Sequence, residues 1–218
     1  MIGVMKKFKT ASPAVKASMA LLFANLILKG LSLISGPIFT RIMPTDQYGI
    51  VSTFQSWQSL LAVIVTLNLS QGVFNNGMLE FKENRDQFEF ALVVITVVCT
   101  GLFLLIFEIF KTSLLNMFEM PLVMVYIMAL YFLFVPAYQF WSGRQRYEYK
   151  YKALSIVTVC IGLFSLLLGV LFVLNVSSGK EAIARVYAME GVNIAVGIFF
   201  FVIIAVKAKF KLRIEYCI

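Results

Sequence analysis

Long apolar runs alternate with short polar stretches along the whole chain. Six runs reach about 20 residues, the length that an α-helix needs to cross a hydrocarbon layer of about 30 Å. None alternates strictly between apolar and polar positions, as transmembrane strands would. The pattern therefore predicts an all-α integral membrane protein with six transmembrane helices and short loops. The predicted spans are Val15–Thr40, Tyr48–Ser70, Phe88–Phe110, Pro121–Phe140, Ala153–Val176 and Ala184–Val206.

Composition supports this class. Hydrophobic residues make up 61% of the 218 residues and charged residues only 14%, whereas a soluble domain carries about 25% charged residues. The apolar run after the basic N-terminus is far longer than the core of a signal peptide, so we expect it to be retained as the first membrane helix. The predicted organisation is a basic cytoplasmic N-terminus (residues 1–14), a six-helix lobe (15–206) and a basic cytoplasmic tail (207–218).

Lysine and arginine residues indicate the orientation. With the N-terminus inside, 14 of the 19 Lys and Arg residues lie on the cytoplasmic side, four lie on the outer side, and Lys29 lies within the first span. Short loops that face the cytoplasm carry an excess of Lys and Arg. The sequence therefore predicts a multi-pass protein of the membrane with both termini cytoplasmic.

Lys29 is the most unusual residue of the first span. It follows Lys16 by 13 residues and precedes Arg41 by 12, so it lies about 18–20 Å from either flank and close to mid-membrane. A lysine there costs about 2.5–3.5 kcal/mol on insertion scales, which makes it a functional candidate. An arc of about 60° on the helical wheel holds the polar or small residues Ser18, Asn25, Lys29, Ser32 and Gly36.

The second span has a similar polar stripe. An arc of about 60° holds Ser52, Gln55, Ser59, Thr66 and Ser70. Two polar stripes of membrane length predict a shared polar cavity between the first two helices. The alternative is that these small and hydroxylated residues only pack the helices closely and form hydrogen bonds across their interface.

Glu190 is the second ionisable residue well inside a span. On the sixth predicted helix it shares a face with Tyr187, Asn193 and Gly197. Three roles are open for it: an ion pair with Lys29, a site for a coupling proton or sodium ion, or a simple interfacial glutamate.

The sequence lacks the residues that metal sites, disulfide frameworks and nucleotide cofactors typically require. The sequence has no histidine, and Cys99, Cys160 and Cys217 form no CxxC pair, so no metal site or disulfide framework is predicted. No P-loop or dinucleotide fingerprint indicates a cofactor. The net charge of +8 is explained by the cytoplasmic cations rather than by nucleic acid. Within the membrane, one cation, one acid, amides and hydroxyls suit binding and passage, and we do not expect an enzyme.

Two segments resemble a known family. The first is "LILKGLSLISGPIFTRIMPTDQYGIVSTFQSWQSLLAVIVTLNLSQGVF", in which "TRIMPTDQYG" directly follows the first helix, and the second is the basic and aromatic "YQFWSGRQRYEYKYKALS". Both resemble polysaccharide biosynthesis proteins, the Wzx-type lipid-linked oligosaccharide flippases of the multidrug/oligosaccharidyl-lipid/polysaccharide exporter (MOP) superfamily. The two segments occur in the family's order, around six helices at the spacing of its first lobe.

The resemblance implies one lobe of a MATE/MOP-like transporter in the bacterial inner membrane. Such proteins move an undecaprenyl-diphosphate-linked oligosaccharide between leaflets by alternating access, with membrane lipids as their surroundings. It implies a role for Arg41 at the outer mouth of the cavity, with a helix C-cap or interfacial anchor as the alternative. The cavity residues that match are Lys29, Asn25, Ser32, Gln55, Ser59 and Arg41.

Members of this family are about twice as long as this chain. The resemblance therefore implies either a truncated product that lacks its second lobe or a homodimer of lobes. A cation-coupled multidrug exporter half, with Glu190 as the ion site, is the alternative function, and an inactive truncated membrane product is the alternative without transport.

Overall fold

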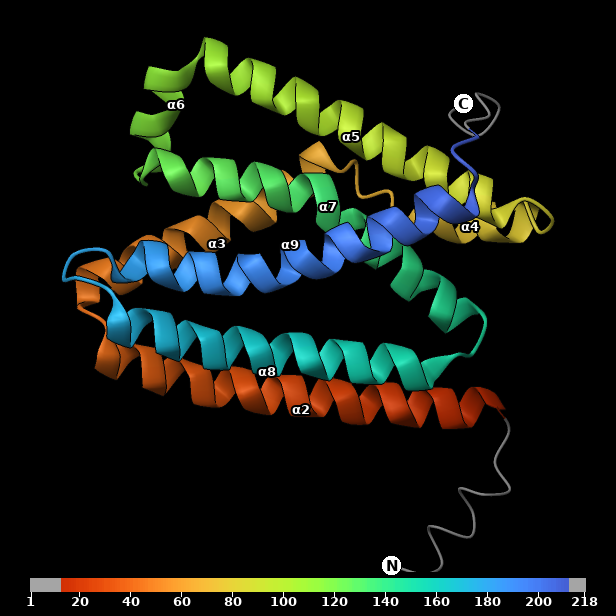
Figure 1. Cartoon of the computed structure of the whole chain (residues 1–218), viewed down its shortest axis with the longest axis horizontal. Coiled ribbons are helices and arrows are strands. Elements are labelled where there is room, and N and C mark those ends of the chain that lie inside the picture. Colours follow the sequence, from red (N-terminus) through yellow and green to blue (C-terminus); the bar gives the residue numbers. More distant parts are fainter. Residues whose placement is uncertain (1–12, 212–218) are drawn as a thin grey trace, which may run out of the picture.

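The computed structural model describes residues 13–211, which fold into helices joined by short loops, with no strand in this range (Figure 1). Residues 1–12 and 212–218, including Cys217 and most of the two predicted basic termini, lie outside the described residues. The helices are α2 (Pro13–Ile42), α3 (Thr45–Val65), α4 (Gly72–Glu80), α5 (Arg85–Ile109), α6 (Lys111–Phe118), α7 (Leu122–Tyr147), α8 (Tyr151–Asn175) and α9 (Glu181–Lys207).

Five helices in the described range are long and apolar enough to cross a membrane, which agrees with five of the six predicted spans. They are α5, α7, α8, α9 and the Met19–Ile42 part of α2. The protein is therefore helical and compatible with several passes through a membrane. The predicted fourth span ends at Phe140, but α7 continues as a helix through Tyr147.

The second predicted span, Tyr48–Ser70, differs from the structure. Its helix, α3, ends at Val65, and Leu67 and Asn68 take left-handed backbone conformations with φ of 51° and 47°. These conformations are unfavourable for residues with a Cβ and end an α-helix. The chain stays unwound until α4 begins at Gly72, and α3 is not among the five candidate spans.

The helices run back and forth between two ends of the molecule. In Figure 1, α3 and α4 together lead from the end where α2 stops to the end where α5 starts, and the described chain begins and finishes at that same end. We call it the basic end, because its loops and helix termini hold Lys82, Arg85, Arg144, Arg146, Lys150, Lys152, Lys207, Lys209 and Lys211. The opposite end has Arg41, Lys111 and Lys180.

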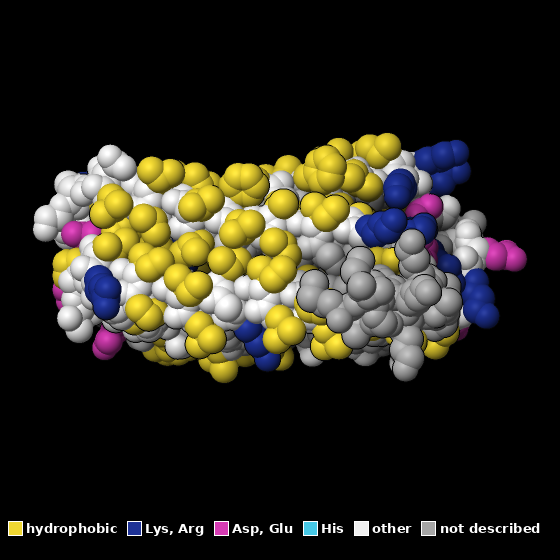
Figure 2. All heavy atoms as spheres, turned by 90° about the horizontal axis from the view of Figure 1, so that it is seen from below, with side chains coloured by type: hydrophobic (Ala, Val, Ile, Leu, Met, Phe, Trp, Pro, Cys, Tyr) yellow, Lys and Arg dark blue, Asp and Glu magenta, His cyan; other side chains and the backbone are white. Residues whose placement is uncertain are grey.

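The hydrophobic core lies around α7 and α9. One cluster of buried hydrophobic residues, including Phe54, Phe107 and Phe132, joins α3, α5, α6, α7 and α9, and it also includes Phe39 of α2 and Val173 of α8. A second cluster, including Phe74 and Phe140, joins α4, α5, α7 and α9 nearer the basic end. α2 lies along α8 at the side of the molecule (Figure 1), and the face in Figure 2 has mainly apolar side chains across its middle.

A bend in α7 shapes the basic end. Figure 1 shows that α7 changes direction midway, and Pro136 lies inside this helix. A proline lacks the backbone N–H and clashes with the preceding turn, which kinks a helix. The second half of α7 therefore turns toward α8 and positions Arg144 and Arg146 at the basic end.

Close contact between α7 and α9 depends on Gly197. A Cβ at Gly197 would lie 2.7 Å from the carbonyl carbon and oxygen of Phe134. We expect Gly197→Ala to lower the free energy of unfolding by about 1–3 kcal/mol, because backbone would have to move. The matched control is Gly191→Ala on the same helix, where nothing lies within 4 Å. Thermal unfolding in detergent checks this, and equal midpoints for the two variants would contradict it.

Candidate functional site

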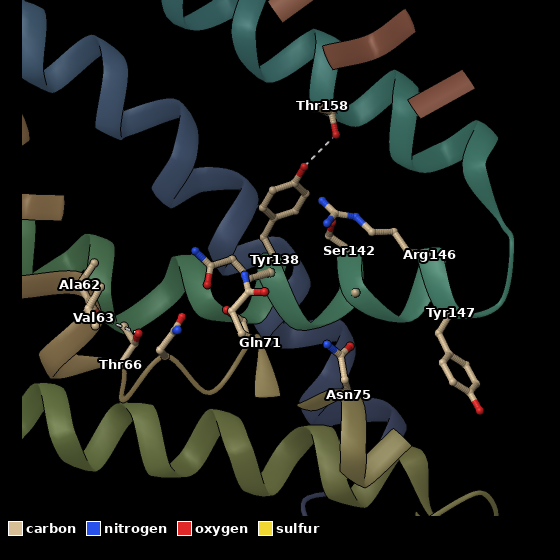
Figure 3. Close-up of a pocket in the computed structure, with 14 residues that line it drawn as sticks. Ala62, Val63, Thr66, Gln71, Asn75, Tyr138, Ser142, Arg146, Tyr147 and Thr158 are labelled. Atoms are coloured by element: carbon tan, nitrogen blue, oxygen red, sulfur yellow. Dashed lines mark hydrogen bonds between the residues drawn. The ribbon is translucent and has the colours of Figure 1, made fainter. Parts of the chain in front are cut away.

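The largest of the described cavities lies where α3 is broken. It has a volume of about 430 Å³, and we call it the Arg146 cavity (Figure 3). Its polar walls come from the unwound segment, α4, α7 and α8, and include Thr66, Asn68, Ser70, Gln71, Asn75, Tyr138, Gln139, Ser142, Arg146 and Thr158. The hydroxyl groups of Tyr138 and Thr158 are 3.0 Å apart and join α7 to α8. Hydroxyl and amide groups therefore dominate this cavity.

Arg146 is the cation of this cavity. Its side chain runs back from the end of α7 toward Tyr138 and Thr158, whereas Tyr147 points away (Figure 3). No described residue forms an ion pair or a hydrogen bond with the guanidinium group of Arg146. A neighbouring cavity of about 150 Å³ shares Arg146 and Thr158 and is also lined by Asn25. The predicted cavity residue Asn25 on α2 therefore faces the same cation.

A smaller cavity of about 160 Å³ lies among α2, α3 and α9. Two of the predicted cavity residues, Ser32 on α2 and Gln55 on α3, line it together. The other lining residues are Ser35, Gly36, Phe39, Met43, Tyr48, Val51, Ser52 and Arg185. The polar stripes of the first two predicted helices thus meet at this cavity, which we call the Arg185 cavity.

The four cations that the sequence places on the outer side are Arg41, Lys111, Lys180 and Arg185. The structure buries the last of them, Arg185. Its side chain lies in α9 and the residue is only 9% exposed. The guanidinium carbon is 4.0 Å from the ring centroid of Phe39, and Nη1 donates a hydrogen bond of 3.0 Å to the carbonyl oxygen of Ser165. Sequence reasoning missed this residue because α9 begins three residues earlier than the predicted sixth span.

Lys29 lies between the two cavities. On α2 it follows Asn25, which lines the cavity next to Arg146, and precedes Ser32, which lines the Arg185 cavity. Its side chain is exposed, and no described residue pairs with it or hydrogen-bonds to it. We call Arg146, Lys29 and Arg185 the cation row. All three lack a carboxylate partner within 4.0 Å in the described chain.

Two other predicted cavity residues, Ser59 and Arg41, are not among the residues that line these cavities. Ser59 is exposed on α3, and its hydroxyl donates a hydrogen bond of 2.8 Å to the carbonyl oxygen of Gln55. Arg41 is exposed in the last turn of α2. That position suits the C-cap or anchor alternative, because a cation near the C-terminus of a helix interacts favourably with the helix dipole.

Glu190 is buried within the lobe rather than at an interface. It is 2% exposed, and Asn193 Nδ2 donates a hydrogen bond of 3.0 Å to its Oε2. The amide of Gln58 approaches it from α3. The structure contains no ion pair between Glu190 and Lys29, so the suggested pairing is wrong. The two residues differ because α9 turns Glu190 into the core, while α2 exposes Lys29.

A cluster of ion pairs at the basic end was not predicted. Arg144 on α7 contacts Asp86, Glu89 and Glu148, and Lys150 also contacts Glu148. Burial alone would raise the pKa of Glu148, but hydrogen bonds from Lys150 and Arg144 outweigh burial and hold that pKa below its ordinary value. The i,i+4 spacing of Arg144 and Glu148 was the available signal in the sequence. This cluster leaves Arg144 paired and Arg146 free.

The arrangement favours binding of polar and anionic groups. Within residues 13–211, no three His, Cys, Asp or Glu side chains are grouped so that they could hold a metal ion. The polar groups that face the cavities are cations, hydroxyls and amides. Guanidinium and ammonium groups bind phosphate and carboxylate, and hydroxyls and amides bind sugar hydroxyls or oxyanions. Comparisons of the chain with protein-family models, with curated proteins and with solved structures found no match.

Proposed function

We propose that this chain is one lobe of a membrane transporter that moves lipid-linked oligosaccharides across the bacterial inner membrane for the assembly of surface polysaccharide. The observation that carries the proposal is the cation row. Arg146, Lys29 and Arg185 have no carboxylate partner in the described chain and follow one another along the polar side of α2.

Unpaired cations at membrane depth need a compensating partner. A central lysine costs about 2.5–3.5 kcal/mol on insertion scales, and the described residues offer Lys29 no counter-ion. The phosphate groups of an anionic lipid head would supply the missing charge. Because the three cations follow one another along the polar side of α2, the head group can pass from one to the next. A difference in its affinity for the inward and outward states shifts the equilibrium between those states.

The remaining polar groups suit the sugar part of the substrate. The Arg146 cavity presents hydroxyls and amides, which donate to and accept from sugar hydroxyls. Large apolar side chains are exposed along α2, including Leu22, Leu26 and Leu33. The lipid chain would stay in the bilayer beside this surface while the head group moves past the polar stripe.

The break between α3 and α4 also supports transport. Non-helical backbone at membrane depth is tolerated where it lines a cavity, and broken helices commonly form the binding sites of transporters. The unwound segment from Thr66 to Gln71 lines the Arg146 cavity. We therefore interpret α3 and α4 together as a sixth, discontinuous pass. With the basic end cytoplasmic, this topology follows the rule that cations remain inside.

A second lobe would complete the cavity. Lys29, Asn25 and Ser59 are exposed at the side of the described lobe, where lipid alone would leave their polar groups unpaired. Either a second lobe or a second copy of this chain would cover them. The alternative function, a cation-coupled drug exporter, is favoured by the buried carboxylate of Glu190, which offers a site for a coupling ion.

Expression of the chain in a bacterial strain that lacks its own oligosaccharide flippase tests the proposal. We expect restored surface polysaccharide, measured with a carbohydrate-specific antibody on intact cells, relative to an empty vector. Resistance to organic cations without restored polysaccharide would favour the exporter. Neither activity, with the protein present in the membrane, would exclude transport by copies of this chain alone and leave an inactive product or a lobe that needs a separate second lobe.

A further inference from the structure

We propose that the Arg185 cavity is a binding site for a single tetrahedral oxyanion, a phosphate group. This inference deepens the proposed function, because it assigns one phosphate contact of the cation row to this cavity, and equilibrium binding to the lobe tests it separately from transport. Its starting observation is a buried arginine without a carboxylate partner in the described chain.

Most of the hydrogen-bonding capacity of Arg185 is unused. Nη1 donates to the carbonyl oxygen of Ser165 on α8, and the face of the guanidinium lies over the ring of Phe39. No described residue accepts a hydrogen bond from Nη2 or Nε. A guanidinium group has five N–H donors in a planar fork that matches the oxygens of phosphate or carboxylate. The donors that remain unpaired therefore match an oxyanion.

Packing holds the guanidinium in this position. A Cβ at Gly169 on α8 would collide with Nη1 of Arg185, so the glycine makes room for the arginine. Phe39 on α2, itself 2% exposed, supports the guanidinium from the other helix. A charged side chain that is fixed by its neighbours loses little conformational entropy when it binds a ligand. The cation is thus preorganised.

The other walls of the cavity present further donors. The hydroxyls of Ser32, Ser35, Ser52 and Tyr48 form no hydrogen bond to any described residue. Gln55 Nε2 has only a weak partner, Met189 Sδ at 3.3 Å, so one amide hydrogen remains free. These donors come from α2 and α3 and face the same cavity as Arg185. Together they can surround an anion from three helices.

No acidic side chain lines the cavity, and the nearby acid of α9 does not pair directly with Arg185. The residues that line it include no Asp or Glu. Glu190, five residues after Arg185 on α9, is the acid that acts on this arginine electrostatically. Its Oε2 accepts a hydrogen bond from Asn193 instead, and it lies beyond 4.0 Å from the guanidinium nitrogens. The charge of Arg185 is therefore attracted by Glu190 but not neutralised by direct contact.

The size of the cavity favours a small ligand. Its volume is about 160 Å³, which is room for a compact anion such as phosphate. An oligosaccharide needs a larger cavity, since sites for drug-sized ligands measure about 300–1,000 Å³. Only the phosphate group itself would enter, whether as free phosphate or as part of a lipid head group.

Equilibrium binding of radiolabelled inorganic phosphate to the purified chain in phosphate-free maltoside micelles tests the site. We expect saturable binding of one phosphate per chain. Arg185→Gln is expected to weaken it by at least about tenfold, since a hydrogen bond to a charged group contributes about 1.5–3 kcal/mol. The matched control is Lys152→Gln, which removes an exposed cation of α8 that does not line the Arg185 cavity and should leave binding unchanged.

A second variant tests the site even if the Arg185→Gln protein does not fold. The double variant Ser52→Ala/Gln55→Leu removes two donors and retains the arginine, and we expect weaker phosphate binding with unchanged helical circular dichroism. Binding that survives both sets of substitutions, or no saturable binding by the wild-type chain in either the micelles or the nanodiscs below, would overturn the proposal.

Binding in nanodiscs shows whether the ligand is free phosphate or the phosphate of a lipid head group. Discs of phosphatidylcholine alone are compared with discs that also contain phosphatidic acid, whose head group is a phosphate monoester. If lipid occupies the site, phosphatidic acid should displace the labelled phosphate from the wild-type chain. If free phosphate occupies it, binding should be equal in both discs. Either result supports an oxyanion site, provided that Arg185→Gln removes the binding.

Discussion

Replacement of Arg144 by leucine is expected to lower the free energy of unfolding by about 3–5 kcal/mol, the typical effect of removing one partner from a buried ion pair. Arg144 Nη1 lies 3.3 Å from Oε2 of Glu89, and Glu89 is only 3% exposed. The other carboxylate oxygen, Oε1, has no hydrogen-bond partner. Without Arg144 the buried carboxylate would lose its hydrogen-bond donor and its direct ion pair and keep only the more distant charge of Lys207, and α5 would lose its ionic link to α7.

A comparison of two variants separates the loss of a buried ion pair from the loss of an exposed one. Thermal unfolding in detergent micelles is compared for Arg144→Leu and for Lys150→Leu. Lys150 forms its ion pair with Glu148 while 67% of its side chain is exposed, and exposed pairs contribute about 1 kcal/mol or less. The double variant Glu89→Leu/Arg144→Leu should recover most of the lost stability, because an apolar pair replaces the ion pair. Equal midpoints for Arg144→Leu and Lys150→Leu would contradict the expectation.

The membrane-spanning helices themselves could be predicted from the sequence. Hydropathy depends on composition over about 20 residues, and five of the six predicted spans correspond to helices that could cross a membrane. The alternation of loops between a basic end and an opposite end also agrees with the prediction. Both properties average over many residues, so no single side chain decides them.

The ends of individual helices were less predictable. The unwound segment "TLNLSQ" from Thr66 to Gln71 contains no glycine or proline, the residues that normally indicate a break. Leu67 and Asn68 nevertheless take positive φ angles. The basic and aromatic stretch after Phe140 looked like a loop, but it continues α7 through Tyr147. In both places tertiary contacts decide the local backbone, and the sequence pattern gives only a weak indication.

The burial of single charged residues was the least predictable feature of the candidate site. Ser32 and Gln55 line one cavity between α2 and α3, where their stripes predicted a shared cavity, whereas Asn25 lines a different cavity with residues of α7 and α8. Arg185 and Glu190 are buried in the lobe instead of lying at an interface. Which face of α9 is interior depends on how α3, α7 and α8 pack around it, and the sequence of α9 alone does not determine that packing. Arg185, the basis of the proposed oxyanion site, could therefore be identified only after the helices were placed.

Replacement of Lys29 by methionine is expected to abolish transport while it improves insertion of α2 into the membrane. Methionine keeps the approximate length of the side chain and removes the charge, which should make insertion more favourable by about 2.5–3.5 kcal/mol. The same variant interrupts the cation row between Asn25 and Ser32. A purely structural role for Lys29 would not make insertion and transport change in opposite directions.

The measurement compares restored surface polysaccharide with the amount of protein in the membrane, in the strain that lacks its own flippase. Lys29→Met and Lys29→Ala should restore none, and Lys29→Arg should restore most, because arginine keeps the positive charge. Lys152→Ala is the matched control, since it removes an exposed lysine at the basic end that belongs to neither polar stripe. Full restoration by Lys29→Met would exclude Lys29 from the mechanism. If Lys152→Ala also fails to restore surface polysaccharide, as Lys29→Met and Lys29→Ala are expected to fail, the total positive charge of the chain matters. The cation row would then have no specific role.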